Sequence, residues 1–340
     1  MYQQIKRLAR KNPSIKNLYR KLVRADITER KFMELEEKVI YKYIYDLEQR
    51  VAALEEKSGV ESTTPKLLES TDDPLPTLEN PISQVATANQ LQSPIFKDWC
   101  QRLGLPNYPN RKTWEFVYIC RVLELNGMIK PGKKGVGFGV GKDPMVAYFA
   151  KNGVDVLATD LDINIAKQKG WVHTNQFSKS LDDLNENGIT SDKNLRNHVK
   201  LRSVDMNSIP DDIEGYDFTW SACAFEHLGS IENGLEFVKN SLKCLKPGGI
   251  AVHTTEFNAS SDEETLTSGP TVLFRRKDIE KLAEALKVEG HQVKLNFHCG
   301  NSYLDQFYDV PPYSDYTHLK LKLQDFLTSS FGFEIQKSNS

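Results

Sequence analysis

The sequence has few cysteines and no excess of charge of either sign. Its five cysteines among 340 residues are odd in number, scattered, and nowhere spaced as Cys-x-x-Cys. This argues against a disulfide framework and against a zinc site, so we predict no metal and expect a cytoplasmic location. The 44 Lys and Arg residues are balanced by 46 Asp and Glu residues. Such a balance argues against nucleic acid as the main partner, because nucleic-acid-binding proteins usually carry a cationic excess.

Long apolar runs are also absent. No stretch approaches 18 consecutive apolar residues, so no transmembrane helix is expected. The first residues, MYQQIKRLARKNPSIK, lack the apolar stretch and the cleavage site of a secretory signal. The chain nevertheless contains 39% hydrophobic and 10% aromatic residues, which is enough for a sizeable core. Its length allows roughly two domains, or one large domain with extensions.

Two helical segments are predicted before the main domain. Residues 1–24 contain eight Lys and Arg residues and no acid, with apolar residues at helical spacing. This pattern is typical of a basic amphipathic helix that makes peripheral contact with an anionic membrane, or with an acidic partner. A solvated, partly frayed extension is the alternative. Residues 28–57 repeat apolar side chains every seven positions, which indicates either a coiled coil that forms a homo-oligomer or a single helix packed on its own domain.

Residues 58–93 are rich in Ser, Thr, Asn and Pro and show little periodicity, so we predict a flexible linker. From residue 94 to residue 340 predicted strands alternate with predicted helices. The clearest strands cover residues 135–138, 154–159, 199–203, 216–221 and 250–255. This alternation favours an α/β domain with a doubly wound, mostly parallel sheet. Two further strands, near 318–326 and 331–337, are expected to form an antiparallel hairpin at the edge of that sheet.

The most informative segment is KGVGFGVGKDPMVAYFAKNGVDVLATDLD, residues 134–162, which predicts a strand, a glycine-rich turn, a helix and a second strand. Gly137, Gly139 and Gly141 allow the backbone to turn tightly and to approach a ligand closely. The turn leads into a helix N-terminus, where free N–H groups favour negative charge. Asp160 ends the second strand, where a carboxylate can accept hydrogen bonds from ribose hydroxyls. Together these parts predict an adenosine-binding unit.

The turn does not fit the Gly-x-Gly-x-x-Gly pattern of dinucleotide-binding proteins, because the last glycine position falls on Lys142 or Pro144. It resembles instead the first motif of the class I S-adenosylmethionine-dependent methyltransferases, which is an acid followed two residues later by Gly-x-Gly-x-Gly. Gly139 and Gly141 match the first two glycines, because Asp160 then lies at the family's usual distance. In this register Asp143 replaces the third glycine, and Gly137 replaces the acid.

Three later segments resemble further motifs of the same family, in the same order. They are SVDMNSIP (203–210), YDFTWSACAFEHLGSI (216–231) and LKCLKPGGIAVHTTEFN (242–258). The resemblance implies a seven-stranded Rossmann-like methyltransferase fold with S-adenosyl-L-methionine as cofactor. It also implies that Asp205, or the backbone beside it at Met206, contacts the adenine. The implied cofactor-binding residues are Gly137, Gly139, Gly141, Asp160, Leu161, Asp205, Met206 and Glu226.

Methyl transfer in this family is an in-line displacement, and a general base is needed only when the acceptor is a hydroxyl or a protonated amine. Candidate bases follow the fourth and fifth strands, where ligands of open α/β sheets bind. His227 is the first choice, because an unperturbed imidazole titrates near neutral pH. His253 and Glu256 are the second choice, although strand alternation places them on opposite faces. Each of the three also has an ordinary structural explanation as a hydrogen-bonded polar side chain.

The leading hypothesis is a methyltransferase that acts at oxygen on a small-molecule or glycan acceptor. The hypothesis of a glycan acceptor is based on analogy. The basic helix, coiled coil and linker resemble the extensions of enzymes that modify surface polysaccharides at the inner membrane surface. One alternative is a non-catalytic member of the fold that binds a partner, which the missing acid at Gly137 supports. Another is an RNA or protein methyltransferase, which the near-neutral charge does not support.

Overall fold

The computed structural model describes residues 65–105, 110–162, 180–311, 313 and 318–339. The chain divides into a unit of residues 1–63 and a unit of residues 64–340, and every element below belongs to the second unit. The basic helix predicted for residues 1–24 and the coiled coil predicted for residues 28–57 lie outside the described residues.

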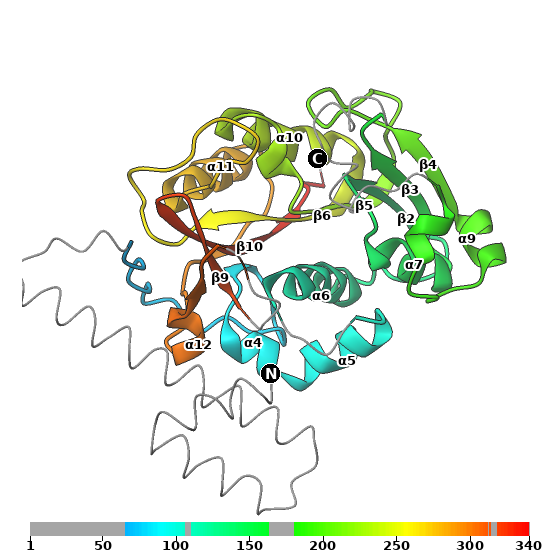
Figure 1. Cartoon of the computed structure of the whole chain (residues 1–340). Helices are drawn as coiled ribbons and strands as arrows, with labels where there is room; N and C mark the ends of the chain where they lie inside the picture. Colours follow the sequence, from blue (N-terminus) through cyan, green and yellow to red (C-terminus); the bar gives the residue numbers. More distant parts are fainter. Residues whose placement is uncertain (1–64, 106–109, 163–179, 312, 314–317, 340) are drawn as a thin grey trace, which may run out of the picture. The chain divides into compact units, whose positions relative to one another are not determined.

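A mostly parallel sheet forms the centre of the second unit (Figure 1). Five of its strands lie parallel in the order β4-β3-β2-β5-β6. They are β2 (Lys134–Phe138), β3 (Asp155–Asp160), β4 (Val199–Ser203), β5 (Tyr216–Ala222) and β6 (Leu245–Asn258). The chain moves outward from β2 in one direction and then from β5 in the other, so the topological switch point lies between the carboxyl ends of these two strands. The predicted doubly wound, mostly parallel sheet is confirmed.

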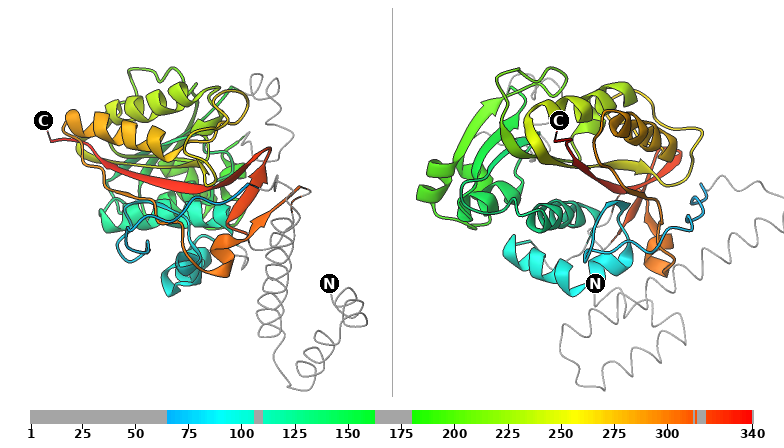
Figure 2. Two further views of the ribbon diagram at one scale, coloured as in Figure 1. Left: turned by 90° about the vertical axis from the view of Figure 1, so that its left-hand side faces the viewer. Right: turned by 180° about the vertical axis from the view of Figure 1, so that it is seen from behind.

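Helices cover both faces of the sheet. Figure 2 shows α10 (Ile231–Lys243) and α11 (Arg276–Val288) on one face, with α4 (Ala88–Gln92), α5 (Pro94–Arg102) and α6 (Arg111–Leu125) on the other. The helices α7 (Pro144–Lys151) and α9 (Asp192–His198) share the hydrophobic core of α6. None of the helices within the described ranges is long and apolar enough to cross a membrane.

Strand alternation divides the buried side chains between two hydrophobic cores. Phe218 and Trp220 of β5 point to the α6 side, where the Phe149 ring lies 5.4 Å and 5.1 Å from their ring centres. Phe138 of β2 points to the α10 side and lies 5.4 Å from the ring of Phe237. Both faces of β2 and β5 are therefore buried, as is usual when helices cover a sheet on both sides.

The last long strand, β10 (Phe326–Gln336), lies inside the sheet and corrects the predicted edge hairpin. β10 does form an antiparallel hairpin with β9 (Lys320–Leu323). It also pairs with β6 along nine consecutive residue pairs, and with β1 (Ser83–Val85) on its other side. The break predicted before residue 331 does not occur, because the hydroxyls of Thr328, Ser329 and Ser330 are buried and hydrogen-bonded.

The segment around β1 lies within the predicted linker but is part of the folded domain. β1 is buried and lies between β10 and β7 (Leu295–Asn296). The amides of two buried glutamines hold this segment: Gln84 donates to the side chain of Gln90 (2.7 Å), and Gln90 donates to the carbonyl of Val85 (2.9 Å). Trp114 of α6 donates its indole N–H to Gln90 as well (2.9 Å). Polar residues of this segment, which led to the linker prediction, therefore form hydrogen bonds with buried groups of the folded domain.

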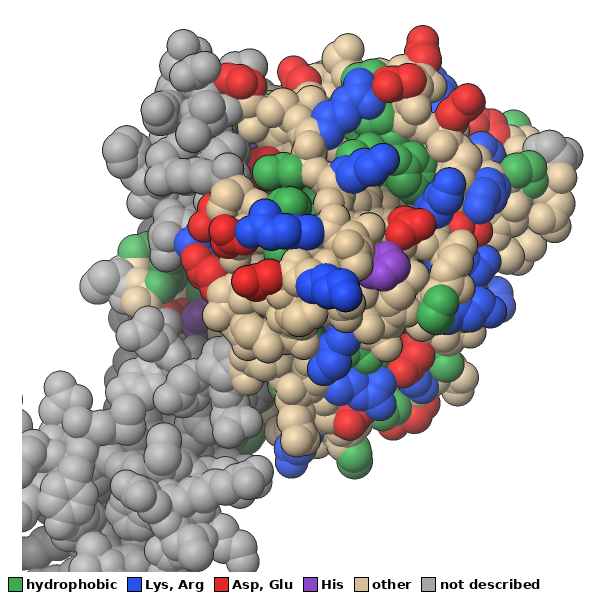
Figure 3. Space-filling model, turned by 90° about the vertical axis from the view of Figure 1, so that its right-hand side faces the viewer, with side chains coloured by type: hydrophobic (Ala, Val, Ile, Leu, Met, Phe, Trp, Pro, Cys, Tyr) green, Lys and Arg blue, Asp and Glu red, His purple; other side chains and the backbone are tan. Residues whose placement is uncertain are grey.

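The sheet gains strands at one end and has an exposed edge at the other. With β1, β7, β8 (Tyr308–Asp309) and β9, it contains ten strands within the described residues rather than seven. At the opposite end β4 is an edge strand on which Lys200 and Arg202 project, and Arg202 pairs with Asp212. Figure 3 shows that charges of both signs are interspersed on this side of the molecule. Charged side chains on an edge strand discourage pairing with another chain.

The substitution Gln90→Ala tests whether this segment stabilises the domain. It leaves the indole N–H of Trp114 and one N–H of the Gln84 amide without their buried acceptor, although the amide keeps its hydrogen bond to the carbonyl of Thr77. We therefore expect a loss of about 1–3 kcal/mol in the free energy of unfolding. Urea denaturation followed by circular dichroism measures this loss. Gln92→Ala, an exposed change in the same helix, is the control. Equal stability of the two variants would contradict the assignment.

Candidate functional site

The loops after β2, β4 and β5 meet at the carboxyl edge of the sheet. Gly139 and Gly141 adopt left-handed backbone conformations, with φ of 58° and 49°. A Cβ atom on Gly139 would lie 2.9 Å from the Cβ of Ala224 and 3.4 Å from the sulfur of Met206. The turn therefore needs glycine for its conformation and for its packing against the other two loops. Gly137 differs, because it lies within β2 and its missing side chain makes room for the ring of Trp220.

Asp160 joins the second strand to this turn. Its Oδ2 accepts a hydrogen bond from the backbone N–H of Gly141 (3.1 Å), and its Oδ1 accepts one from Leu161 (2.8 Å). Burial raises the pKa of Asp160 to about 6, although the two backbone hydrogen bonds act in the opposite direction. Each carboxylate oxygen retains a further lone pair, so the group can accept additional hydrogen bonds from a ligand.

Asp143 is a second acid at the same turn. It occupies the N-cap position of α7, but its side chain makes no capping hydrogen bond. Only 7% of the residue is exposed, and Oδ2 has no hydrogen-bond partner within the described part of the chain. Burial raises the pKa of Asp143 to about 8; nearby Lys112 lowers it, whereas Glu115 and Asp160 raise it further. The turn therefore carries a buried carboxyl group that is poorly satisfied by the protein.

The first turns of α6 bring further charged groups to this edge. α6 begins after a capping box in which Asn110 and Thr113 satisfy each other's backbone N–H groups. Arg111 lies 2.5 Å from the carboxylate of Glu256. The side chains of Lys112 and Cys223 contact the buried carboxylate of Glu115, which they approach to 3.1 Å and 3.0 Å.

Burial alone would lower the pKa of Arg111 and of Lys112, but the paired acids raise both above their usual values. Sequence reasoning missed Arg111, Lys112 and Cys223 as site residues. A helix cap directly before two basic residues is the signal that could have found the first two. Cys223 has no such signal, since only the structure shows its left-handed backbone (φ 45°) at the end of β5.

Glu226 and His227 lie in a short 3-10 helix, Phe225–His227, after β5. Glu226 is fully buried and accepts a hydrogen bond from Thr255 (3.1 Å), and burial raises its pKa. His227 Nδ1 lies 2.8 Å from the carbonyl of Pro270, which can only accept a hydrogen bond. Nδ1 therefore carries the proton in the neutral ring, and Nε2, 4.0 Å from Glu226, is the basic nitrogen.

The structure separates the two second-choice bases. His253 is fully buried beneath α10, where Ser221 and Ser241 contact its two ring nitrogens at 2.8 Å and 3.0 Å. Burial lowers the pKa of His253 to about 3. Glu256 lies on the other face of β6, as the alternation predicts, and Arg111 and Thr328 hold its two oxygens. His253 is therefore placed as a core residue, whereas Glu256 belongs to the charged edge.

Asp205 and Met206, expected at the adenine, follow β4 at the same edge. Asp205 is exposed and accepts a hydrogen bond from the backbone of Asn207 (2.9 Å). Met206 is buried against the glycine turn. The predicted residues Gly139, Gly141, Asp160, Leu161, Asp205, Met206, Glu226 and His227 thus all lie in the loops at this edge.

Cys223, Glu226 and Glu256 form a cluster of possible metal ligands. Their ligand atoms lie within 4.8 Å of one another. Glu256, however, is already neutralised by the guanidinium of Arg111. The guanidinium of Arg111 therefore supplies the positive charge that a metal ion would otherwise bring to this cluster.

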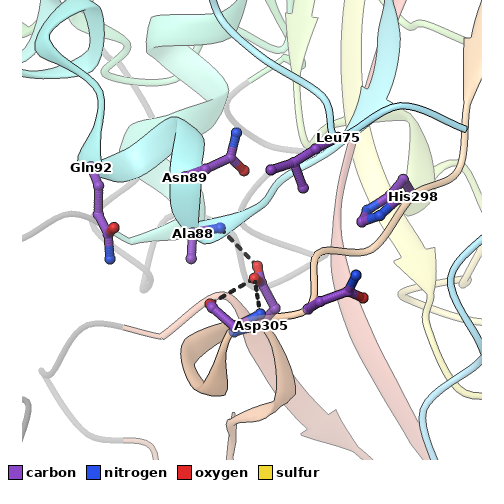
Figure 4. A pocket seen from close by; sticks show the side chains of 8 residues that line it. Leu75, Ala88, Asn89, Gln92, His298 and Asp305 are labelled. Carbon is purple, nitrogen blue, oxygen red and sulfur yellow. Dashed lines mark hydrogen bonds between the residues drawn. The ribbon is translucent and has the colours of Figure 1, made fainter.

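A cavity of about 230 Å³ lies away from this edge, between α4 and α12 (Tyr303–Gln306) (Figure 4). Leu75, Asn89 and His298 contribute to its wall. Its buried acid, Asp305, is fully used within the protein: it accepts hydrogen bonds from the backbone of Ala88 (2.7 Å) and from Ser302 (2.7 Å). The cavity is smaller than the roughly 300 Å³ of typical cofactor pockets, and we assign it no part in the site.

The chain also matches a known protein family. A family model described as a methyltransferase domain matches residues 112–294, more than half of the 340 residues. The fold and the glycine turn define the class I S-adenosylmethionine-dependent methyltransferases. The chain belongs to this methyltransferase-domain family.

Several solved structures are similar to the chain at low identity. A protein described as a sarcosine dimethylglycine methyltransferase from Galdieria sulphuraria is 16% identical, with a TM-score of 0.40 over 67% of this chain and 85% of that one. A methyltransferase from Aquifex aeolicus is 16% identical, with a TM-score of 0.35 over 64% and 87%. The glycopeptide N-methyltransferase MtfA, complexed with sinefungin, is 13% identical, with a TM-score of 0.32 over 46% of this chain and 54% of that one. No curated protein matches the chain.

The burial of Asp143 predicts a pH-dependent stability. Its pKa of about 8 in the folded protein exceeds the usual 3.8, so the stability that the neutral carboxyl contributes is present below about pH 4 and is lost as the pH rises to 8. Asp143→Asn removes this loss, and we expect the variant to gain stability over the wild type progressively towards pH 8. Urea denaturation at several pH values measures the difference, with the exposed change Asp211→Asn as control. Parallel pH profiles for wild type and Asp143→Asn would contradict the prediction.

Proposed function

We propose that the chain binds S-adenosyl-L-methionine at the glycine turn and transfers its methyl group to an oxygen atom of a small-molecule or carbohydrate-type acceptor. The observation that carries this proposal is the meeting of the turn, Asp160 and the Glu226–His227 pair at one edge of the sheet. This edge is the topological switch point, where open α/β sheets bind their ligands.

The residues at this edge fit an adenosine cofactor. Asp160 is anchored to the turn by Gly141 and can still accept hydrogen bonds from ribose hydroxyls. Gly139 has no side chain that would fill the space beside Ala224 and Met206. The cofactor, when bound, supplies a methyl group activated by the adjoining positive sulfur. The protein contributes position: it holds the acceptor atom in line with that methyl group, which accounts for much of the acceleration in such reactions.

A hydroxyl acceptor must lose its proton as the methyl group arrives. His227 is suited to take this proton, because Pro270 holds the Nδ1 proton and leaves Nε2 as the base. Glu226 then stabilises the imidazolium across 4.0 Å. Glu256 is less suited, since Arg111 and Thr328 hold both of its oxygens. The carbohydrate-type acceptor is supported by the basic helix and coiled coil predicted at the N-terminus, by analogy with enzymes that modify glycans at membranes.

Asp160→Asn tests the cofactor site. The change removes the negative charge that would face the ribose, so we expect binding of S-adenosylmethionine to weaken by about 1–3 kcal/mol. Isothermal titration measures the dissociation constants. Asp155→Asn, at the amino end of the same strand, is the matched control and should bind as the wild type does. Unchanged affinity in Asp160→Asn would exclude Asp160 as the ribose ligand.

Transfer of a labelled methyl group to a panel of hydroxylated small molecules and sugars tests the acceptor class. With an acceptor from this panel, His227→Ala is expected to lower kcat by roughly 10²–10⁴-fold, the usual contribution of a general base. Affinity for the cofactor should change less than twofold. His198→Ala, whose ring pairs with Asp155 at the other end of the strands, is the control. Wild-type turnover of His227→Ala at every pH would remove His227 from the mechanism.

A further inference from the structure

The proposed site leaves Asp143 without a role. This acid is 93% buried, because only 7% of its surface is exposed, and its Oδ2 has no hydrogen-bond partner in the described ranges. It does not cap α7, although it stands at the capping position. A buried carboxyl group without partners costs stability, so its place in a ligand-binding turn calls for an explanation beyond packing.

Burial and the neighbouring acids keep the carboxyl group of Asp143 mostly protonated at neutral pH until a cation approaches it. Glu115 and Asp160 are close enough to raise its pKa further, and Lys112 is the cation that lowers it. Lys112, however, is already bound to the carboxylate of Glu115 (3.1 Å) and to the carbonyl of Ala222 (3.2 Å). Arg111 also lies 3.9 Å from Glu115, but it is held by Glu256 at 2.5 Å, and no cation within the described residues forms an ion pair with Asp143. A cationic group supplied by a ligand would therefore be attracted to the acids of this turn.

Asp143 and Asp160 lie on either side of the same turn. Asp160 binds the N–H of Gly141, whereas the backbone N–H of Asp143 returns to the carbonyl of Val140 (2.9 Å). A nucleoside held by Asp160 through its ribose would therefore have its 5′ substituent beside the turn that carries Asp143. Lys112, whose side chain is 44% exposed, lies close enough to Asp143 to lower its pKa, and it can also meet an anionic group.

We propose that Asp143 and Lys112 form a subsite for the amino-acid end of the cofactor, with Asp143 binding its α-ammonium group and Lys112 facing its α-carboxylate. This inference rests on the proposed function, because the ribose at Asp160 determines where the amino-acid end lies. The two protein charges complement the two charges of an α-amino acid. Asp143 also supplies, from the far side of the turn, the negative charge that is missing at Gly137.

Two nucleosides distinguish this subsite from the ribose site. S-adenosylhomocysteine carries the amino-acid end, and 5′-methylthioadenosine lacks it. Isothermal titration of the full chain measures the dissociation constants of both nucleosides. Asp143→Asn should weaken the binding of S-adenosylhomocysteine at least tenfold and change the affinity for 5′-methylthioadenosine less than twofold. Lys112→Gln should show the same pattern. Asp160→Asn should weaken the binding of both nucleosides. Asp211→Asn, at an exposed position, should leave the binding of both unchanged.

The outcomes separate the inference from the proposed function. Equal weakening of both nucleosides by Asp143→Asn, or no weakening of S-adenosylhomocysteine, overturns the subsite while the proposed function stands. Failure of the wild type to bind either nucleoside overturns the proposed function, and the subsite with it.

A measurement on the wild type avoids any effect of the substitutions on folding. Asp143 has a pKa of about 8 in the ligand-free protein, so it is mostly protonated at pH 7. Binding of an ammonium group favours the ionised carboxylate, and the site should release close to one proton with S-adenosylhomocysteine. Titration in two buffers of different ionisation enthalpy measures this release. Equal proton release with 5′-methylthioadenosine would overturn the subsite.

Discussion

The hydrogen bond from the backbone of Gly141 to the carboxylate of Asp160 organises this site. It ties the end of β3 to the turn after β2, and so brings residues that are 19 positions apart in the sequence to the same edge. The turn can approach Asp160 because Gly139 and Gly141 adopt left-handed conformations that other residues rarely adopt. The carboxylate stays largely buried there, which raises its pKa and makes it responsive to hydrogen-bond donors of a ligand.

A second constraint is electrostatic. The first turns of α6 carry Arg111 and Lys112 to buried acids, so charges at the start of this helix are balanced by Glu256 of β6 and by Glu115 of α6 itself. Buried ion pairs contribute little net stability, because desolvation costs roughly what the attraction returns. Their concentration at the carboxyl edge therefore favours a functional explanation, in which fixed charges orient a polar ligand without having to reorganise.

Much of the fold could be predicted because its signals are local. The parallel strands are short apolar runs between helices with clear starts, and β2 and β3 were predicted within about a residue of their ends. β1 and the interior position of β10 were not predicted. β1 is three residues long and contains Ser83 and Gln84, whose burial depends on partners far along the chain, such as the carbonyl of Glu334. β10 contains a polar stretch, Thr328–Ser330, that appears as a break until Glu256 and Glu115 are placed beside it.

By itself the sequence determined the family, the glycine turn and the acid at the end of the second strand, because these depend on residue type and spacing along one continuous segment. Only the tertiary structure decided which polar groups meet. Strand alternation and helix packing placed His253 in the core under α10 and left Glu226 and His227 at the edge. They also left Oδ2 of Asp143 buried without a hydrogen-bond partner among the residues that the structure describes, since burial and pairing are properties of distant segments brought together by the fold.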